Sequence, residues 1–157
     1  MRKVWQGERF SVLVGERIEV ADTPAAVTIV AVDAEGRIVL VRQTRPAIGV
    51  ELLELPAGLI DEDEEPLAAA QRELREETGL HGGSWRELAS FWTSPGFATE
   101  RVTVFVAEGL EEGEPEPDDG EEIEVVRWTL EEVEAQVPEL EDATTLIGLL
   151  LYLRERT

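Results

Sequence analysis

The sequence contains no cysteine among its 157 residues, which excludes disulfides, a thiolate nucleophile and a cysteine-based zinc site. Its longest apolar stretch, 146–153, is interrupted by Gly148 and falls short of the roughly 18 residues that a membrane span requires. Arg2 and Lys3 are not followed by the apolar segment of a secretory signal. We therefore expect a cytoplasmic protein that does not act at a membrane.

Basic side chains are also scarce. The chain has 14 Lys and Arg residues against 35 Asp and Glu residues, which gives a formal net charge of -21. Such a charge repels nucleic acids and anionic membranes, so we expect no nucleic-acid partner. It would also repel a phosphate-bearing small molecule unless cations intervene. Genome composition, or growth at high temperature or high salt, would explain the acidity without any specific function.

The chain length and a hydrophobic content of 43% predict a single folded domain over residues 1–157. Alternating apolar residues and turn residues predict strands at 9–14, 17–20, 25–32, 37–42, 51–55, 85–92, 101–108 and 123–129. Helical spacing predicts helices between Pro66 and Gly79, over 130–137 and over 142–154. This order predicts an α/β fold with a mixed sheet.

The first predicted helix carries Glu73, Glu76 and Glu77 three and four residues apart, so the three carboxylates share one face. Like charges at this spacing destabilise a helix, whereas a divalent cation would favour them. Hard cations such as Mg²⁺ prefer oxygen ligands. Taken alone, however, a glutamate-rich helix face is most often merely solvated.

The surrounding residues follow a longer pattern that starts at Gly58 and ends at Leu80. It reads Gly-x5-Glu-x7-Arg-Glu-Leu-x-Glu-Glu-x-Gly-Leu, without a gap. This stretch resembles the Nudix box, and the chain resembles a Nudix hydrolase across most of its length. The resemblance implies an α/β/α sandwich in which a loop–helix–loop holds a divalent metal against a diphosphate.

The resemblance also implies roles for individual residues. The implied metal ligands are Glu73, Glu76, Glu77 and the backbone carbonyl of Ala57, with Mg²⁺, Mn²⁺ or another divalent cation as cofactor. Arg72 would orient a box carboxylate, while Gly58 and Glu64 would shape the loop. Cleavage of a phosphoanhydride requires neutralised phosphate oxygens and an activated water, and metal ions supply both.

Two further stretches resemble the ADP-ribose pyrophosphatases of this family. One is "SPGF" at 94–97, with Glu100 after it, and the other is "LVRQTRPAIGVELLELPAG" at 40–58. The resemblance implies substrate contacts at Arg45, Pro95, Gly96, Phe97 and Glu100. It implies hydrolysis of ADP-ribose to AMP and ribose 5-phosphate. Another nucleoside diphosphate sugar or a dinucleotide polyphosphate is the alternative, and Pro-Gly is also ordinary turn chemistry.

The same subfamily uses a loop glutamate to activate water. Glu121 is the closest match, with Glu122 and Asp119 as rivals and Glu76 or Glu73 as the next candidates. An idle Nudix module used for binding, or an acidic structural protein, are competing readings. The intact box glutamates argue against the first, and their spacing against the second.

Residues 1–22 are shorter than the N-terminal strands of the resembled enzymes, which exchange these strands between two subunits. We still expect a homodimer, with residues 1–22 as its candidate dimerisation segment, and leave strand exchange open. Trp5 and Phe10 could stack on adenine or pack in a core or interface. Trp85, Trp92 and Trp128 are expected in the core, and His81 at the surface.

Overall fold

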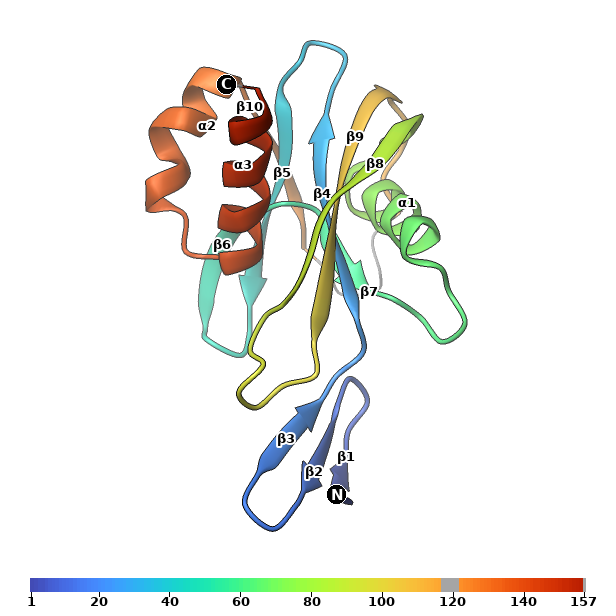
Figure 1. Ribbon diagram of the computed structural model, residues 1–157. Coiled ribbons are helices and arrows are strands. Elements are labelled where there is room, and N and C mark those ends of the chain that lie inside the picture. The colour runs from blue at the N-terminus through green and yellow to red at the C-terminus, as the bar shows by residue number, and fades with distance from the viewer. Residues whose placement is uncertain (117–121, 157) are drawn as a thin grey trace.

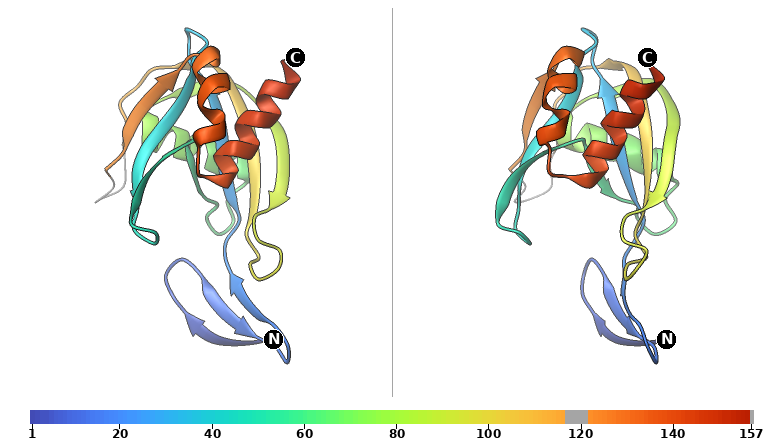
Figure 2. Two further views of the ribbon diagram at one scale, coloured as in Figure 1. Left: turned by 90° about the vertical axis from the view of Figure 1, so that its left-hand side faces the viewer. Right: turned by 60° about the vertical axis from the view of Figure 1, so that its left-hand side comes forward.

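A computed structural model describes residues 1–116 and 122–156 of the chain. The chain begins with three short antiparallel strands that pair in chain order. They are β1 (Arg2–Gln6), β2 (Ser11–Val14) and β3 (Glu19–Asp22). Figures 1 and 2 show this small sheet standing apart from the main body, to which β3 leads directly. Because little packs against it, every residue of β1 is exposed.

The main sheet has seven strands. They are β4 (Ala26–Val32), β5 (Ile38–Arg45), β6 (Val50–Glu54), β7 (Ala57–Leu59), β8 (His81–Trp92), β9 (Arg101–Glu111) and β10 (Glu124–Trp128). Their order is β10-β5-β4-β9-β8, with β6 added to β5 and β7 added to β4. The β4–β9 pair is parallel, and β4 is apolar except for Thr28 because both of its faces are covered.

Helices cover both faces of this sheet (Figures 1 and 2). Helix α1 (Pro66–Thr78) lies on one face, whereas α2 (Leu130–Gln136), the 3-10 turn η1 (Val137–Glu139) and α3 (Ala143–Glu155) lie on the other. The buried side chains accordingly form two clusters, one around Leu74 of α1 and one around Tyr152 of α3. The predicted α/β/α sandwich is confirmed. Within the described ranges, none of the helices combines the length and apolar character needed to cross a bilayer.

Helix α1 begins and ends at the residues that the sequence indicates. Pro66 occupies the first turn, where a missing N–H costs no hydrogen bond. Gly79 ends the helix in the left-handed region at φ 77°, and its N–H donates to the carbonyl of Arg75 at 2.8 Å. Ala69, Ala70 and Leu74 are buried on the sheet side, whereas Leu67 is 40% exposed.

A split in the main sheet creates the space for a site. Strands β4 and β5 pair directly only near their connecting turn, where Ala31 faces Val39 and Val32 faces Ile38. Beyond these positions β7 takes over the edge of β4, and β6 takes over the edge of β5. The two halves therefore diverge and leave a cleft between them.

Three local expectations differ from the structure. Neither β1 nor β7 was among the predicted strands. The three residues of β7 are too few to show a strand pattern. Trp92, expected in the core, is 52% exposed and lies under the guanidinium of Arg101, 5.6 Å from its ring centroid. The expected core positions of Trp85 and Trp128 hold in part, since both are half-buried against the two clusters.

Candidate active site

The cleft between the two halves of the sheet has a volume of about 780 Å³. It opens over β4, β7 and α1 on one side and over the β5–β6 hairpin on the other. The start of α3 and the turn between β1 and β2 complete its rim. Its ionisable lining consists of Arg9, Arg45, Glu54, Asp61, Arg72, Glu73, Glu76, Glu77, Glu100 and Asp142. Seven carboxylates against three arginines make this a site that favours cations.

Arg72 lies at the centre of the acidic face of α1 and uses all three of its nitrogens. Its Nη1 donates to Glu73 at 2.6 Å and to Glu76 at 3.2 Å. Its Nε and Nη2 grip both oxygens of Glu64 at 3.0 and 2.8 Å, and Nη2 also donates to the carbonyl of Leu59. These hydrogen bonds lower the pKa of Glu64 and raise the pKa of Arg72. The guanidinium of Arg72 therefore links the loop to the helix and partly offsets the repulsion between the glutamates of the helix.

The loop–helix–loop is closely packed around the box carboxylates. A Cβ added at Gly58 would overlap the carboxylate of Glu73, so glycine is what lets that carboxylate lie against the loop. Glu77 is 7% exposed, and its carboxylate accepts a hydrogen bond from the backbone N–H of Ala57 at 3.2 Å. Both contacts link β7 to α1, and the predicted ligands Glu73, Glu76, Glu77 and Ala57 all line the cleft.

These residues fit a divalent cation in kind, because they present only hard oxygen donors. In the described conformation the carboxylates of Glu73 and Glu76 engage Arg72, and Glu77 engages the loop. Among residues 1–116 and 122–156, no three acidic or histidine side chains converge as the ligands of one ion would. The assignment of the ligands thus stays a prediction, to which the shared cleft gives a location.

Arg45 reaches the opposite wall of the cleft and is paired there. Its Nε lies 3.0 and 3.1 Å from the two oxygens of Glu54, and its Nη2 lies 2.5 Å from one of them. Glu54 is 3% exposed and also accepts from the Nε2 of Gln43 at 3.3 Å. The hydrogen bond to Glu54 is the main reason why the pKa of Arg45 is raised. Since Nε and Nη2 face Glu54, the remaining nitrogen, Nη1, is the one placed to bind a ligand.

The loop 93–100 carries four of the substrate contacts that the resemblance implies, and only one of them lines the cleft. Glu100 lines the cleft, but Pro95, Gly96 and Phe97 are not among its lining residues, and Phe97 is 60% exposed. This loop instead holds the small N-terminal sheet. The N–H of Ala21 donates to the carbonyl of Phe97 at 2.7 Å, and the N–H of Thr99 donates back to Ala21 at 3.0 Å.

The candidate bases lie on the segment that follows Glu116. Glu121 and Asp119 fall outside the residues that the structure describes. Glu122 is described and exposed. The assignment of a base therefore remains a prediction.

Several lining residues were not singled out from the sequence, among them Arg9, Thr23, Glu54 and Asp142. For Glu54 a signal existed, because an acidic residue interrupts an otherwise apolar strand end. Arg9 and Thr23 belong to the N-terminal segment, whose approach to the cleft no local pattern indicates. Asp142 is recognisable only as the N-cap of α3, where it accepts the N–H of Thr145 at 2.7 Å.

Comparison with known proteins agrees with this geometry. The NUDIX domain model matches residues 22–146. The ADP-ribose pyrophosphatase of Bacillus subtilis (strain 168) is 41% identical over 142 residues, which are 87% of this chain and 77% of that protein. The GDP-mannose pyrophosphatase of Citrobacter koseri is 36% identical over 147 residues, 86% and 76% of the two chains. A solved ADP compounds hydrolase superposes with a TM-score of 0.81 at 25% identity, covering 99% of this chain and 90% of that one.

Proposed function

Because this chain belongs to the Nudix family, we propose that it hydrolyses the diphosphate of ADP-ribose to AMP and ribose 5-phosphate. Water adds across the phosphoanhydride, so that each product keeps one phosphate. The observation that carries this proposal is the cleft that joins the acidic face of α1, organised by Arg72, to Arg45 on the facing hairpin. The relatives named for ADP-ribose and for ADP compounds support the choice of substrate.

The cofactor in this proposal is a divalent cation, Mg²⁺ or in its place Mn²⁺, held by Glu73, Glu76, Glu77 and the carbonyl of Ala57. When bound, such a cation neutralises phosphate oxygens and lowers the pKa of water. Arg72 keeps the carboxylates of Glu73 and Glu76 from separating.

The chain's other residues in this proposal bind substrate or take a proton. Arg45, held by Glu54, offers Nη1 to a phosphate oxygen. Glu100 lies in the same cleft and would contact the substrate. Glu121 is the proposed general base, since a carboxylate outside the ligand set remains free to accept the proton of water.

A second substrate class is supported by a specific observation. The relative named for GDP-mannose matches almost as much of this chain as the relative named for ADP-ribose. The cleft chemistry that recognises a diphosphate is common to both substrates. Hydrolysis of another nucleoside diphosphate sugar is therefore the alternative.

We further propose that the protein acts as a cytoplasmic homodimer. Trp5 and Phe10 support this, because they are 50% and 39% exposed on the small N-terminal sheet and their rings pair at 5.1 Å. Large exposed aromatic side chains are typical of association surfaces.

Product analysis tests the function. ADP-ribose, GDP-mannose and a dinucleotide polyphosphate are incubated separately with the protein and Mg²⁺, and products are separated by chromatography. We expect AMP and ribose 5-phosphate from ADP-ribose at the highest kcat/KM. Glu77→Gln is the matched control and should lose about a hundredfold in rate or more while staying folded. Turnover of GDP-mannose above that of ADP-ribose would replace the proposed substrate, and full activity of Glu77→Gln would refute the ligand set.

A further inference from the structure

The last turn of α1 carries two of the three box carboxylates. The helix ends at Thr78, so Glu76 and Glu77 lie within its final turn. Carbonyl groups in the last turn lack partners inside the helix, and helix ends fray for this reason. Fraying here would displace both carboxylates. A structure that holds this turn therefore bears on the site.

A segment from outside the helix, residues 112–116, caps this turn. The N–H of Glu116 donates to the carbonyl of Glu76 at 2.9 Å and so satisfies an oxygen that the helix leaves unpaired. Gly113 packs directly against the helix end. A Cβ on Gly113 would lie 2.8 Å from the carbonyl oxygen of Gly79, and a Cβ on Gly79 would overlap the carbonyl of Gly113. The backbones at Gly79 and Gly113 therefore lie so close together that a side chain at either position would overlap the other residue.

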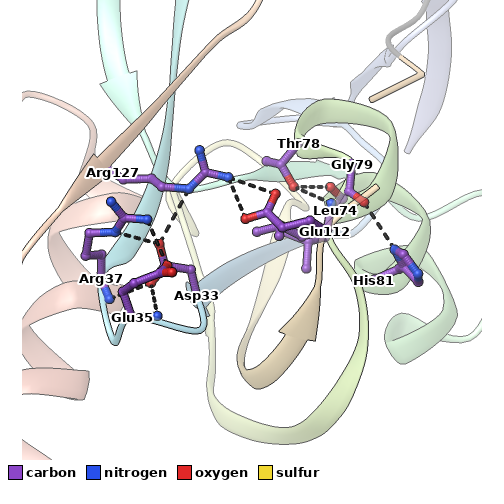
Figure 3. Close-up of polar contacts among 10 residues, drawn as sticks. Asp33, Glu35, Arg37, Leu74, Thr78, Gly79, His81, Glu112 and Arg127 are labelled. Atoms are coloured by element: carbon purple, nitrogen blue, oxygen red, sulfur yellow. Dashed lines mark hydrogen bonds and ion pairs between the residues drawn. The ribbon is translucent and has the colours of Figure 1, made fainter. Parts of the chain in front are cut away.

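An arginine of the sheet pairs with Glu112 at the start of this segment (Figure 3). Nη2 of Arg127 in β10 donates to both oxygens of Glu112 at 3.0 and 3.1 Å. Nε of Arg127 lies 3.5 Å from Oδ2 of Asp33, which is an ion pair without a hydrogen bond. Arg127 therefore joins the turn after β4 to the segment that caps the helix.

The Asp33 carboxylate that pairs with Arg127 is itself held in place by several hydrogen bonds. The side chain of Asp33 is 0% exposed. Its Oδ2 accepts from Nε of Arg37 at 2.8 Å, and its Oδ1 accepts the backbone N–H groups of Glu35 and Arg37 at 3.0 and 2.8 Å. A buried carboxylate with this many donors has no freedom to follow Arg127, so Arg127 must instead conform to it.

We propose that Arg127, paired with Asp33, is a positioning residue. Through Glu112 it clamps residues 112–116 onto the end of α1, and this clamp holds Glu76 and Glu77 in place for the divalent cation. The proposal deepens the proposed function and rests on it for the role of the cation. Exposed ion pairs usually contribute little to global stability, and Glu112 is exposed. The clamp is therefore expected to act on local order at the helix end more than on the stability of the whole fold.

Hydrogen exchange on the metal-free protein tests the clamp without any reference to activity. In Arg127→Ala and in Glu112→Ala, amides of the α1 end and of residues 112–116 should exchange about tenfold faster, because local opening sets exchange in such segments. Arg86→Ala is the control, since it breaks an ion pair with Glu155 that involves neither Asp33 nor Glu112. Faster exchange at the α1 end in Arg86→Ala as well, or none in Arg127→Ala, would overturn the clamp.

Metal titration tests what the clamp does for the site. The Mg²⁺ concentration for half-maximal activity should rise about three- to tenfold in Arg127→Ala, while kcat at saturating Mg²⁺ stays within about twofold. Arg127→Lys should recover much of the difference, and the double variant with Glu112→Ala should be no worse than either single one. Arg86→Ala, which breaks the remote ion pair to Glu155, should leave the Mg²⁺ requirement unchanged.

The two tests separate the clamp from the function. If the parent protein hydrolyses no nucleoside diphosphate sugar, the proposed function fails, and calorimetric Mg²⁺ binding replaces activity as the readout of the site. Unchanged Mg²⁺ binding or activation in Arg127→Ala, together with faster exchange at the helix end, would overturn the link between the clamp and the cation.

Discussion

Gly58 shows how one missing side chain serves the site. Its φ does not lie in the left-handed region, so its backbone does not require glycine. What requires glycine is the carboxylate of Glu73, which a Cβ would overlap. Since that carboxylate is the end of a flexible side chain, alanine here should displace Glu73 rather than disrupt the fold.

We therefore expect Gly58→Ala to separate activity from stability. The moved Glu73 carboxylate would lose its place beside Arg72 and in the predicted ligand set, which should cost about ten- to a hundredfold in kcat/KM. The free energy of unfolding should change by less than about 1 kcal/mol. Steady-state kinetics and denaturant unfolding measure the two effects. Arg86→Ala, which breaks an ion pair with Glu155 outside the cleft, is the control.

Glu54 is the second residue whose importance lies in what it holds. It is buried, and its two oxygens fix Nε and Nη2 of Arg45. In Glu54→Gln the charge is lost and Arg45, which is half-exposed, can turn toward solvent. We expect KM for ADP-ribose to rise roughly tenfold or more, with a smaller change in kcat, because a misplaced binding group weakens substrate positioning.

A double-mutant cycle decides whether Glu54 acts through Arg45. If it does, the effects of Glu54→Gln and Arg45→Ala on KM are not additive, and the double variant resembles Arg45→Ala. Additive effects would show that Glu54 contributes to the site by another route.

At the scale of elements, features set by neighbouring residues were predictable from the sequence, whereas contacts between distant segments were not. The limits of α1 were predictable because Pro66 and Gly79 act on their own turns. The shared face of Glu73, Glu76 and Glu77 was predictable from their spacing on one helix, whereas their role as metal ligands is implied by the resemblance to the Nudix box and stays a prediction. The approach of Arg9 to the cleft and the contact between Arg127 and Glu112 were not, because they depend on which distant segments the fold makes neighbours. Exposure of a strand residue such as Trp92 likewise depends on what covers its face.

Helix α2 carries a capping box that makes a pH-dependent contribution to stability. The Oε2 of Glu132 accepts the N–H of Thr129 at 2.7 Å and its hydroxyl at 2.9 Å, while Oγ1 of Thr129 accepts the N–H of Glu132 at 3.2 Å. The two bonds that it accepts lower the pKa of Glu132. A lowered folded-state pKa means that this stabilisation is complete above the ordinary glutamate value of about 4.3 and is lost as the pH falls through the folded-state pKa.

We therefore expect Glu132→Gln to melt at a lower temperature than the parent at pH 7, with a difference that shrinks as the pH falls below about 4.3. Thermal unfolding of both proteins across this range measures it. The other carboxylates titrate in both proteins and cancel in the comparison. A difference that persists undiminished at pH 3 would show that the glutamine disturbs the helix start for a reason other than charge.

The molecule as a whole carries a net charge of -21 and brings seven carboxylates to one cleft. General acidity and a specific cation site respond differently to added salt. Any salt screens the repulsion across the surface, because screening depends on ionic strength. A site formed by carboxylates of the folded cleft discriminates between ions, and a ligand that binds the folded state raises its stability by mass action.

Thermal scans in Mg²⁺ and in Na⁺ at equal ionic strength therefore distinguish these two effects. At a Mg²⁺ concentration about 100 times Kd, binding to the folded state should raise Tm by roughly 5–10 °C beyond the effect of Na⁺, because about 2.7 kcal/mol shifts a chain of this size by that amount. In Glu77→Gln most of this excess should vanish, whereas the shift in Na⁺ should be that of the parent. Equal shifts in the two salts would mean that the acidic cleft is screened like the rest of the surface and has no particular affinity for a divalent cation.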